Sequence, residues 1–279
     1  IEFLALDHFL HDMRLYKSRA EVSAMRRAAR LSAQAHCELM RHCEPGLYEY
    51  QLASLFSHHC QMNGAAHLAY SSIVGGGSNA CVLHYVENSH VLIQGDLVLI
   101  DAGCEVECYA SDITRTFPVG GRFSAAQRAL YEVVLEAQLA AIAKVRAGNH
   151  WNDPHQAAAR ALTKGLLKLG LLRGTLAKAL KTQSYARFFM HRTGHWLGMD
   201  VHDVGDYKID GHWRELEPGM VLTVEPGLYI PHGAKGVAKK WQGIGIRIED
   251  DVLVTRGEPD VLTRDVPKSV EQIEALMAR

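Results

Sequence analysis

Five side chains in this sequence have the types and positions expected of ligands for divalent cations. Asp101 and Glu225 end the apolar runs LVLI and VLTV, and Glu249 follows the strand-like segment GIRI. A strand–turn–strand could fold Asp112 back beside Asp101, and His195 lies in the segment FMHRTGHWLGMDVHDVG. Because burying unpaired carboxylates is costly, four acids at the ends of apolar segments indicate that they share cations.

This donor set favours two hard or borderline metal ions. Two divalent ions carry four positive charges, which four carboxylates neutralise, and the His195 imidazole is a neutral ligand. Oxygen-rich sites suit Mn²⁺, and Co²⁺ or Zn²⁺ would also accept these ligands. A thiolate site at Cys104 and Cys108 is rejected, since only two soft ligands lie there and none of the 6 cysteines forms a CxxC pair. We therefore expect two divalent ions, with Mn²⁺ preferred.

Three further histidines are candidates for the same site. His191 and His202 lie in the same segment as His195, and His84 lies in VLHYVEN. Any one of the 16 histidines is ordinarily a solvated or hydrogen-bonded side chain. His195 differs because it stands beside Gly194 in an apolar context, where an imidazole without a ligand has little role.

Composition and charge narrow the classes of protein. The chain has 279 residues, of which 48% are hydrophobic and 22% charged, enough for a sizeable core. A formal charge of -1 gives no reason to expect nucleic acid or a membrane surface as partner, and no apolar run approaches the roughly 18 residues of a membrane helix. Cysteines without a disulfide pattern favour reduced thiols in the cytoplasm. The opening residues IEFLALDHFL lack an initiator Met and a signal pattern, so we expect a piece of a longer protein.

The expected elements run in the order helices, strands, helices and strands, which predicts one α+β domain. Ser18 and Glu21 form a capping box at the first long helix. Gly75–Gly77 lacks the ending of a phosphate-binding loop, so a plain flexible loop is expected there. Helices are expected over residues 18–43, 48–62, 124–146, 154–169, 176–180 and 269–278, and strands in AYSSIVGGG, VLHY, LVLIDAG, MVLTVEP, GIGIRIEDD and VLVT.

Six segments together resemble one known family. HYVEN, LVLIDAG, SDITRTFP, HWLGMDVHDVG, LEPGMVLTVEPGLYI and GIGIRIEDD are similar to the catalytic domain of the aminopeptidase P (Xaa-Pro aminopeptidase) family, within the creatinase or pita-bread metallopeptidases. The resemblance implies a pita-bread fold, a curved antiparallel sheet flanked by helices, over residues 14–279. It also implies that residues 1–13 are the remnant of a linker from a missing N-terminal domain, and that the full-length protein is a homo-oligomer.

The resemblance assigns roles to particular residues. It implies a dinuclear site, usually of Mn²⁺, in which Asp112 and Glu249 contact both ions while Asp101 and His195 each hold one. The fifth ligand matches Glu225. The family's substrate-facing histidines match His84, His191 and His202, and its positions around the ligands match Tyr70, Tyr229 and Arg247.

The reaction implied is hydrolysis of the bond between an N-terminal residue and a following proline, by a hydroxide bridging two metal ions. Glu225 would accept the proton and pass it to the proline nitrogen. His202 would stabilise the oxyanion, and His84 and His191 would position the substrate. The free α-amine would bind near a metal and Asp101, which explains exopeptidase activity.

Three alternatives stay open, and one departure from the family is visible. Prolidase uses the same site on Xaa-Pro dipeptides, and some pita-bread proteins are non-catalytic binding modules that typically lack the ligands. Methionine aminopeptidase is disfavoured, because the HDVG and RIEDD blocks fit it poorly. Arg192 follows His191 where relatives often have Gly, which matters if that position requires a positive φ.

Overall fold

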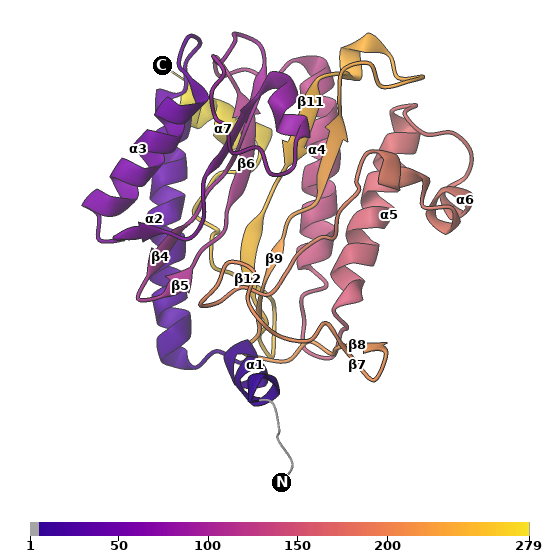
Figure 1. Ribbon diagram of the computed structural model, residues 1–279. Helices are drawn as coiled ribbons and strands as arrows, with labels where there is room; N and C mark the ends of the chain where they lie inside the picture. Colours follow the sequence, from indigo (N-terminus) through magenta and orange to yellow (C-terminus); the bar gives the residue numbers. More distant parts are fainter. Residues whose placement is uncertain (1–5, 279) are drawn as a thin grey trace.

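The computed structural model describes residues 6–278, and its strands lie between two groups of helices (Figure 1). Helices α2 (Arg19–His42) and α3 (Glu49–Met62) lie to one side, and α4 (Ala125–Ile142) and α5 (Asn152–Lys168) to the other. In these residues no helix is both long and apolar enough to cross a bilayer. The mixture of helices and antiparallel strands confirms the expected α+β class.

Three antiparallel sheets carry the centre of the molecule. Their strand orders are β2-β3-β6, β13-β12-β9 and β10-β11. Their bounds are β2 Ile73–Gly76, β3 Leu97–Asp101, β6 Thr114–Pro118, β9 Val221–Val224, β10 Gly227–Ile230, β11 Ile244–Arg247, β12 Asp250–Leu253 and β13 Asp260–Val261.

Short elements complete the described chain. They are α1 Asp7–Leu15, β1 His67–Leu68, η1 Gly77–Cys81, β4 Cys104–Val106, β5 Tyr109–Ala110, α6 Leu176–Lys181, η2 Ser184–Arg187, β7 Lys208–Ile209, β8 His212–Trp213, η3 Lys239–Trp241 and α7 Val270–Met277.

Capping residues set the start of the long helices, as the sequence predicts. The Ser18 hydroxyl accepts from the amide of Glu21, whose carboxylate accepts from the Ser18 amide at 2.7 Å. Ser124 and Gln127 form the same reciprocal pair at α4. These interactions satisfy amides that have no partner within the first turn. The expected helices are confirmed, although α4 ends at Ile142 rather than near residue 146.

Two local predictions were wrong. The segment VLHY is not a strand but a turn, in which Val82 is 54% exposed and the Tyr85 hydroxyl donates to the buried Glu49 carboxylate at 2.8 Å. Gly75 and Gly76 form no flexible loop, since both pair with β3 inside β2. A Cβ at Gly75 would lie 2.9 Å from the Ala80 amide nitrogen, so close backbone packing explains the glycine there.

A buried ionic network joins β6, β12 and α4. Arg115 on β6 and Asp250 on β12 are both 0% exposed and are joined at 2.8 Å. Lys268 and Gln138 donate to the other oxygen of Asp250, at 2.6 and 2.7 Å. Arg115 also donates to the backbone carbonyl of Glu249 at 2.5 Å. Because buried charges need partners, this network fixes the backbone of β12 relative to β6 and α4.

Removing the Asp250 carboxylate is expected to destabilise the fold strongly. In Asp250→Ala, Arg115 loses its buried counter-charge, so the free energy of unfolding should fall by about 3–5 kcal/mol. Urea denaturation followed by circular dichroism measures this change. In the control Glu132→Ala, which removes an exposed partner of Arg128, the change should stay within about 0.5 kcal/mol. Losses of equal size in both variants would contradict the role of the network.

Candidate metal centre

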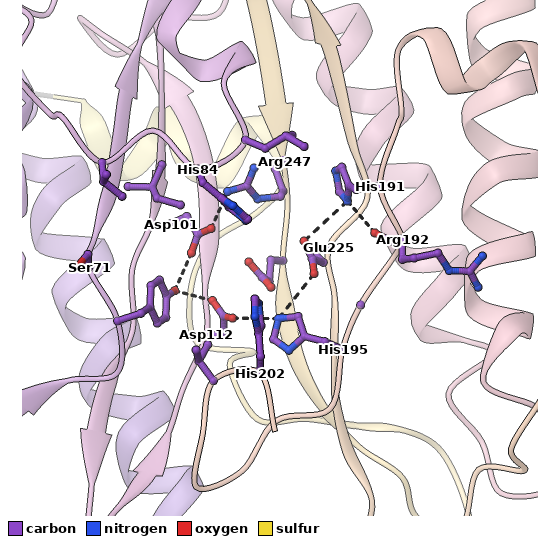
Figure 2. A pocket seen from close by; sticks show the side chains of 17 residues that line it. Ser71, His84, Asp101, Asp112, His191, Arg192, His195, His202, Glu225 and Arg247 are labelled. Atoms are coloured by element: carbon purple, nitrogen blue, oxygen red, sulfur yellow. Dashed lines mark hydrogen bonds and ion pairs between the residues drawn. The ribbon is translucent and has the colours of Figure 1, made fainter. Parts of the chain in front are cut away.

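The candidate ligands lie at the ends of strands that face a common space (Figure 2). Asp101 is the last residue of β3, and Glu225 directly follows β9. Asp112 lies between β5 and β6, and Glu249 lies between β11 and β12. His195 lies on the segment that runs beside β9, where the Thr223 amide donates to the His195 carbonyl at 3.0 Å.

Backbone pairing sets the relative positions of His195 and Glu225. The Glu225 amide donates to the Thr193 carbonyl at 2.9 Å, and the His195 amide donates to the Thr223 hydroxyl at 3.1 Å. A Cβ at Gly194 would lie 2.0 Å from the Thr223 carbonyl oxygen. Only glycine therefore permits this close approach, which brings the imidazole next to the carboxylate.

The other three acids are joined through β6 and its neighbours. Asp101 pairs with Thr114 across the β3–β6 ladder, and the Glu249 amide donates to the Thr114 carbonyl at 3.1 Å. The Asp112 amide donates to the Asp251 carboxylate at 3.1 Å. Residues distant in the sequence are thereby held in one register, as the strand-turn-strand prediction for Asp101 and Asp112 requires.

The ligand atoms approach one another closely. His195 Nε2 lies 3.4 Å from Asp112 Oδ2 and 3.7 Å from Glu225 Oε1. Possible ligand atoms of Asp112, His195 and Glu249 all lie within 4.8 Å of one another. The Tyr70 hydroxyl lies 2.6 Å from an oxygen of Asp101 and 2.5 Å from one of Asp112, and it can donate to either.

Burial makes this concentration of negative charge unfavourable. It raises the pKa of Glu249 well above the ordinary value, and the neighbouring acids raise it further. Burial likewise raises the pKa of Glu225 to about 7 and that of Asp101 above its usual range. Burial alone would raise the pKa of Asp112 and lower that of His195. Their attraction for each other, together with the charges and hydrogen bonds around them, outweighs burial, so that the pKa of Asp112 is lowered and that of His195 is raised to about 9. Without cations, the cluster must therefore take up protons.

Divalent cations fit this donor set. Four carboxylates and one imidazole face the same space, with Arg247 as a neighbouring positive charge that bonds Asp101 at 2.6 Å. One guanidinium cannot balance four carboxylates, whereas cations bound by their oxygens would. Asp112, His195 and Glu249 form the tightest part of this candidate site.

A cavity of about 450 Å³ opens onto the acids. All three predicted substrate-facing histidines line it, as do Tyr70 and Arg247. Tyr229 does not line the cavity, because it is fully buried behind His191. The cavity is lined by Tyr70, Ser71, Ile73, Leu83, His84, Val86, Asp101, Asp112, His191, Arg192, Gly194, His195, Val201, His202, Glu225, Arg247 and Glu249.

Hydrogen bonds fix the orientation of His191. Arg247 donates to the Tyr229 hydroxyl at 3.1 Å, and that hydroxyl lies 2.9 Å from His191 Nε2. Burial lowers the pKa of His191 to about 4, so the ring is neutral near pH 7. The Tyr229 hydroxyl then donates to Nε2, while Nδ1 donates to the Arg192 carbonyl at 2.7 Å.

The position of Arg192 does not need the glycine that relatives often have there. Arg192 is not among the described residues with a positive φ. Its side chain turns away from the acids (Figure 2), bonds Asn152 and lies over the Trp213 ring at 5.0 Å. The Gly-to-Arg difference therefore places no strain on the backbone beside His191.

Two supporting residues were missed by the sequence reasoning. The Thr114 hydroxyl donates to Glu249 at 2.5 Å and accepts from Arg247 at 3.1 Å. Asp251 holds the Asp112 amide, as described above. Both lie in quoted segments, SDITRTFP and GIGIRIEDD, but their roles depend on strand pairings that a single sequence does not reveal.

A cluster of carboxylates with an imidazole, lining a cavity of an antiparallel α+β fold, is an arrangement that metal-dependent hydrolases use. The chain belongs to metallopeptidase family M24, whose family model matches residues 23–256. The expected pita-bread fold is thereby confirmed, since solved aminopeptidases of that fold superimpose on this structure.

Named relatives agree with this family. An Xaa-Pro aminopeptidase from Escherichia coli (strain K12) is 48% identical over 268 residues, covering 96% of this chain and 60% of the relative. The structure of Pseudomonas aeruginosa aminopeptidase PepP is similar with a TM-score of 0.99 and 58% identity, covering 100% of this chain and 63% of that one. A human Xaa-Pro dipeptidase is 39% identical over 300 residues, covering 96% of this chain and 61% of the relative. The chain thus spans about three-fifths of the length of these relatives.

The raised pKa of Glu225 predicts a pH-dependent penalty in the metal-free protein. The pKa of Glu225 is raised to about 7 in the folded protein. The charged form of Glu225 should therefore lower the free energy of unfolding as the pH rises from the pKa of the unfolded chain to about 7. The buried His36 and the partly buried His155, whose pKa values loss of solvent contact lowers to about 4, titrate in the opposite sense. The comparison is therefore between wild type and Glu225→Gln, both stripped of metal. The variant should gain about 2 kcal/mol relative to wild type between pH 5 and pH 8.

Urea unfolding at several pH values measures this difference. The control Glu258→Gln, which changes an exposed acid, should show no pH-dependent difference from wild type. Parallel curves of stability against pH for wild type and Glu225→Gln would contradict the raised pKa of Glu225.

Proposed function

We propose that the protein is an aminopeptidase that releases the N-terminal residue from peptides with proline in second position. The observation that carries this proposal is the meeting of four carboxylates, His195 and three further histidines in one cavity, in a member of the M24 family. The similarity to Xaa-Pro aminopeptidases supports the substrate class.

The proposed ligands are Asp101, Asp112, His195, Glu225 and Glu249. They would hold two divalent ions, with Mn²⁺ preferred and Co²⁺ or Zn²⁺ accepted. Such ions, when bound, supply a lower pKa for coordinated water and polarise a carbonyl group.

Side chains of the cavity would transfer the proton, stabilise the oxyanion and position the substrate. Glu225, which lines the cavity, would accept a proton from the attacking water and deliver it to the proline nitrogen. His202 is exposed to the cavity and would donate a hydrogen bond to the developing oxyanion. His84 and the oriented His191 would position the peptide, with its free amine near Asp101.

Several further expectations belong to this proposal. Residues 14–279 would form the catalytic domain, and residues 1–13 the end of a linker from an N-terminal domain. The full-length protein would be a homo-oligomer without nucleic-acid or membrane partners. All 6 cysteines are free, which suits the reducing cytoplasm.

Prolidase activity is the second candidate, because the chain is also similar to a human Xaa-Pro dipeptidase. The length of the preferred substrate distinguishes the two activities. With Mn²⁺ present, an Xaa-Pro-Xaa tripeptide should be cleaved with a kcat/KM at least about 10-fold above that of the matching Xaa-Pro dipeptide, since one decade is about 1.4 kcal/mol of transition-state binding. Chromatography of the released amino acid measures both rates. Faster cleavage of the dipeptide would favour prolidase, and no cleavage of either would favour a binding module.

Glu225 is expected to be indispensable. Glu225→Ala and Glu225→Gln should lower kcat by about 10²–10⁴-fold, because both remove the proton acceptor. Because Glu225 is also a proposed metal ligand, the metal content of the same samples shows whether activity is lost through loss of metal. Glu258→Ala should keep the parent rate. Retention of more than about 5% of the parent kcat by a metal-loaded Glu225 variant would contradict this role.

A further inference from the structure

The loop that carries His202 has no regular structure of its own. Residues 197–205 contain neither helix nor strand. The His202 ring projects into the cavity and meets the His195 ring edge-on, with centroids 4.3 Å apart (Figure 2). The position of His202 therefore depends on whatever holds this loop.

The next residue, Asp203, anchors the loop on the side away from the cavity. Its side chain is 1% exposed, and its Oδ2 lies 3.1 Å from Nζ of Lys17, which is also 1% exposed. Its Oδ1 accepts from Arg14, and its amide donates to the Trp196 carbonyl at 3.0 Å. The Lys17 amide in turn donates to the Gly219 carbonyl at 2.9 Å. The anchor thus joins the loop to the junction of α1 and α2.

The loop also packs closely against the ion pair. A Cβ at Gly198 would lie 2.0 Å from Asp203 Oδ2 and 2.9 Å from Cε of Lys17, so the loop closes directly over the ion pair. The Gly198 carbonyl accepts from the Ala110 amide at 2.8 Å. The loop is therefore fixed both to the ion pair and to the strand that leads to Asp112.

A buried ion pair is a weak source of stability, because desolvation offsets most of the Coulomb attraction. The hydrogen bonds of the pair are directional, however, and they favour one backbone conformation of the loop. A neighbouring pair makes a useful contrast: Arg14 also bonds Asp200 at 2.7 Å, but the Asp200 side chain is 65% exposed. Exposed pairs contribute little.

We propose that Asp203, held by Lys17 and Arg14, is a positioning residue that fixes His202 in the cleft. Its role rests on the proposed function, since His202 is the group that would meet the substrate. Loss of the anchor leaves His202 present but misplaced, and a misplacement of about 1 Å can cost about 100-fold in rate.

The single variant Asp203→Asn would leave the buried Lys17 without its counter-charge and is expected to destabilise the fold. The test therefore uses Lys17→Met/Asp203→Leu, which replaces both members of the ion pair by apolar side chains of similar size and is expected to fold. Its kcat on a proline-second tripeptide should fall about 10- to 100-fold, with bound metal unchanged. The control Asp200→Asn should stay within about twofold of the parent. A folded, metal-loaded double variant with the parent kcat would overturn the proposal.

A second arm separates positioning from general destabilisation. In a His202→Ala background, the same double substitution should lower kcat by less than about twofold, because the group it positions is already gone. An equal loss in both backgrounds would show that Asp203 does not act through His202.

A third arm is independent of peptidase activity. Hydrogen exchange of amides in residues 198–205 should be at least about 10-fold faster in the double variant than in the parent, while exchange in α4 stays unchanged. If the parent cleaves no proline-second peptide, the proposed function fails, and this exchange result still decides whether the anchor holds the loop. Unchanged exchange in the loop would overturn the proposal.

Discussion

Mutual repulsion among four closely spaced carboxylates, two of them buried and two partly buried, explains why so much of this molecule is organised around its cleft. Asp101, Asp112, Glu225 and Glu249 line one cavity and are largely removed from solvent, so their like charges repel more strongly than they would in bulk water. One guanidinium, Arg247, relieves part of that repulsion. Proton uptake or bound cations must relieve the remainder, and this requirement links the fold to the proposed chemistry.

The supporting structure spreads outward from the acids in steps. Tyr70 and Thr114 bond their oxygens directly. Behind them, Asp251 and Arg115 hold the backbone at Asp112 and Glu249. The buried network around Arg115 then joins β6, β12 and α4. Each step satisfies a buried polar group, so that the site and the core stabilise one another.

Much of this arrangement could be predicted from the sequence, because it follows from local patterns. Capping boxes such as Ser18 with Glu21 marked the helix starts, and apolar runs that end at Asp101 and Glu225 marked the strands. The candidate ligands and cleft histidines do lie together around one cavity. Their roles in binding metal and substrate remain predictions.

The rest depends on contacts between distant segments. VLHY has strand-like composition, but Tyr85 is held in a turn by its bond to Glu49. Gly75 resembles a loop residue, yet it pairs with Leu99 inside β2, and the close approach of the Ala80 backbone requires a glycine there. The pairing of Lys17 with Asp203 joins residues far apart in the chain and follows no periodic pattern. Only the folded arrangement reveals such contacts.

Counting bound metal tests the shared cation site most directly. Inductively coupled plasma mass spectrometry of protein incubated with Mn²⁺ and then freed of loose ions should give two divalent ions per chain. Asp112→Asn, which keeps the side-chain shape but removes a charge from the centre of the cluster, should bind fewer. A wild-type chain that retains no divalent ion would contradict the account.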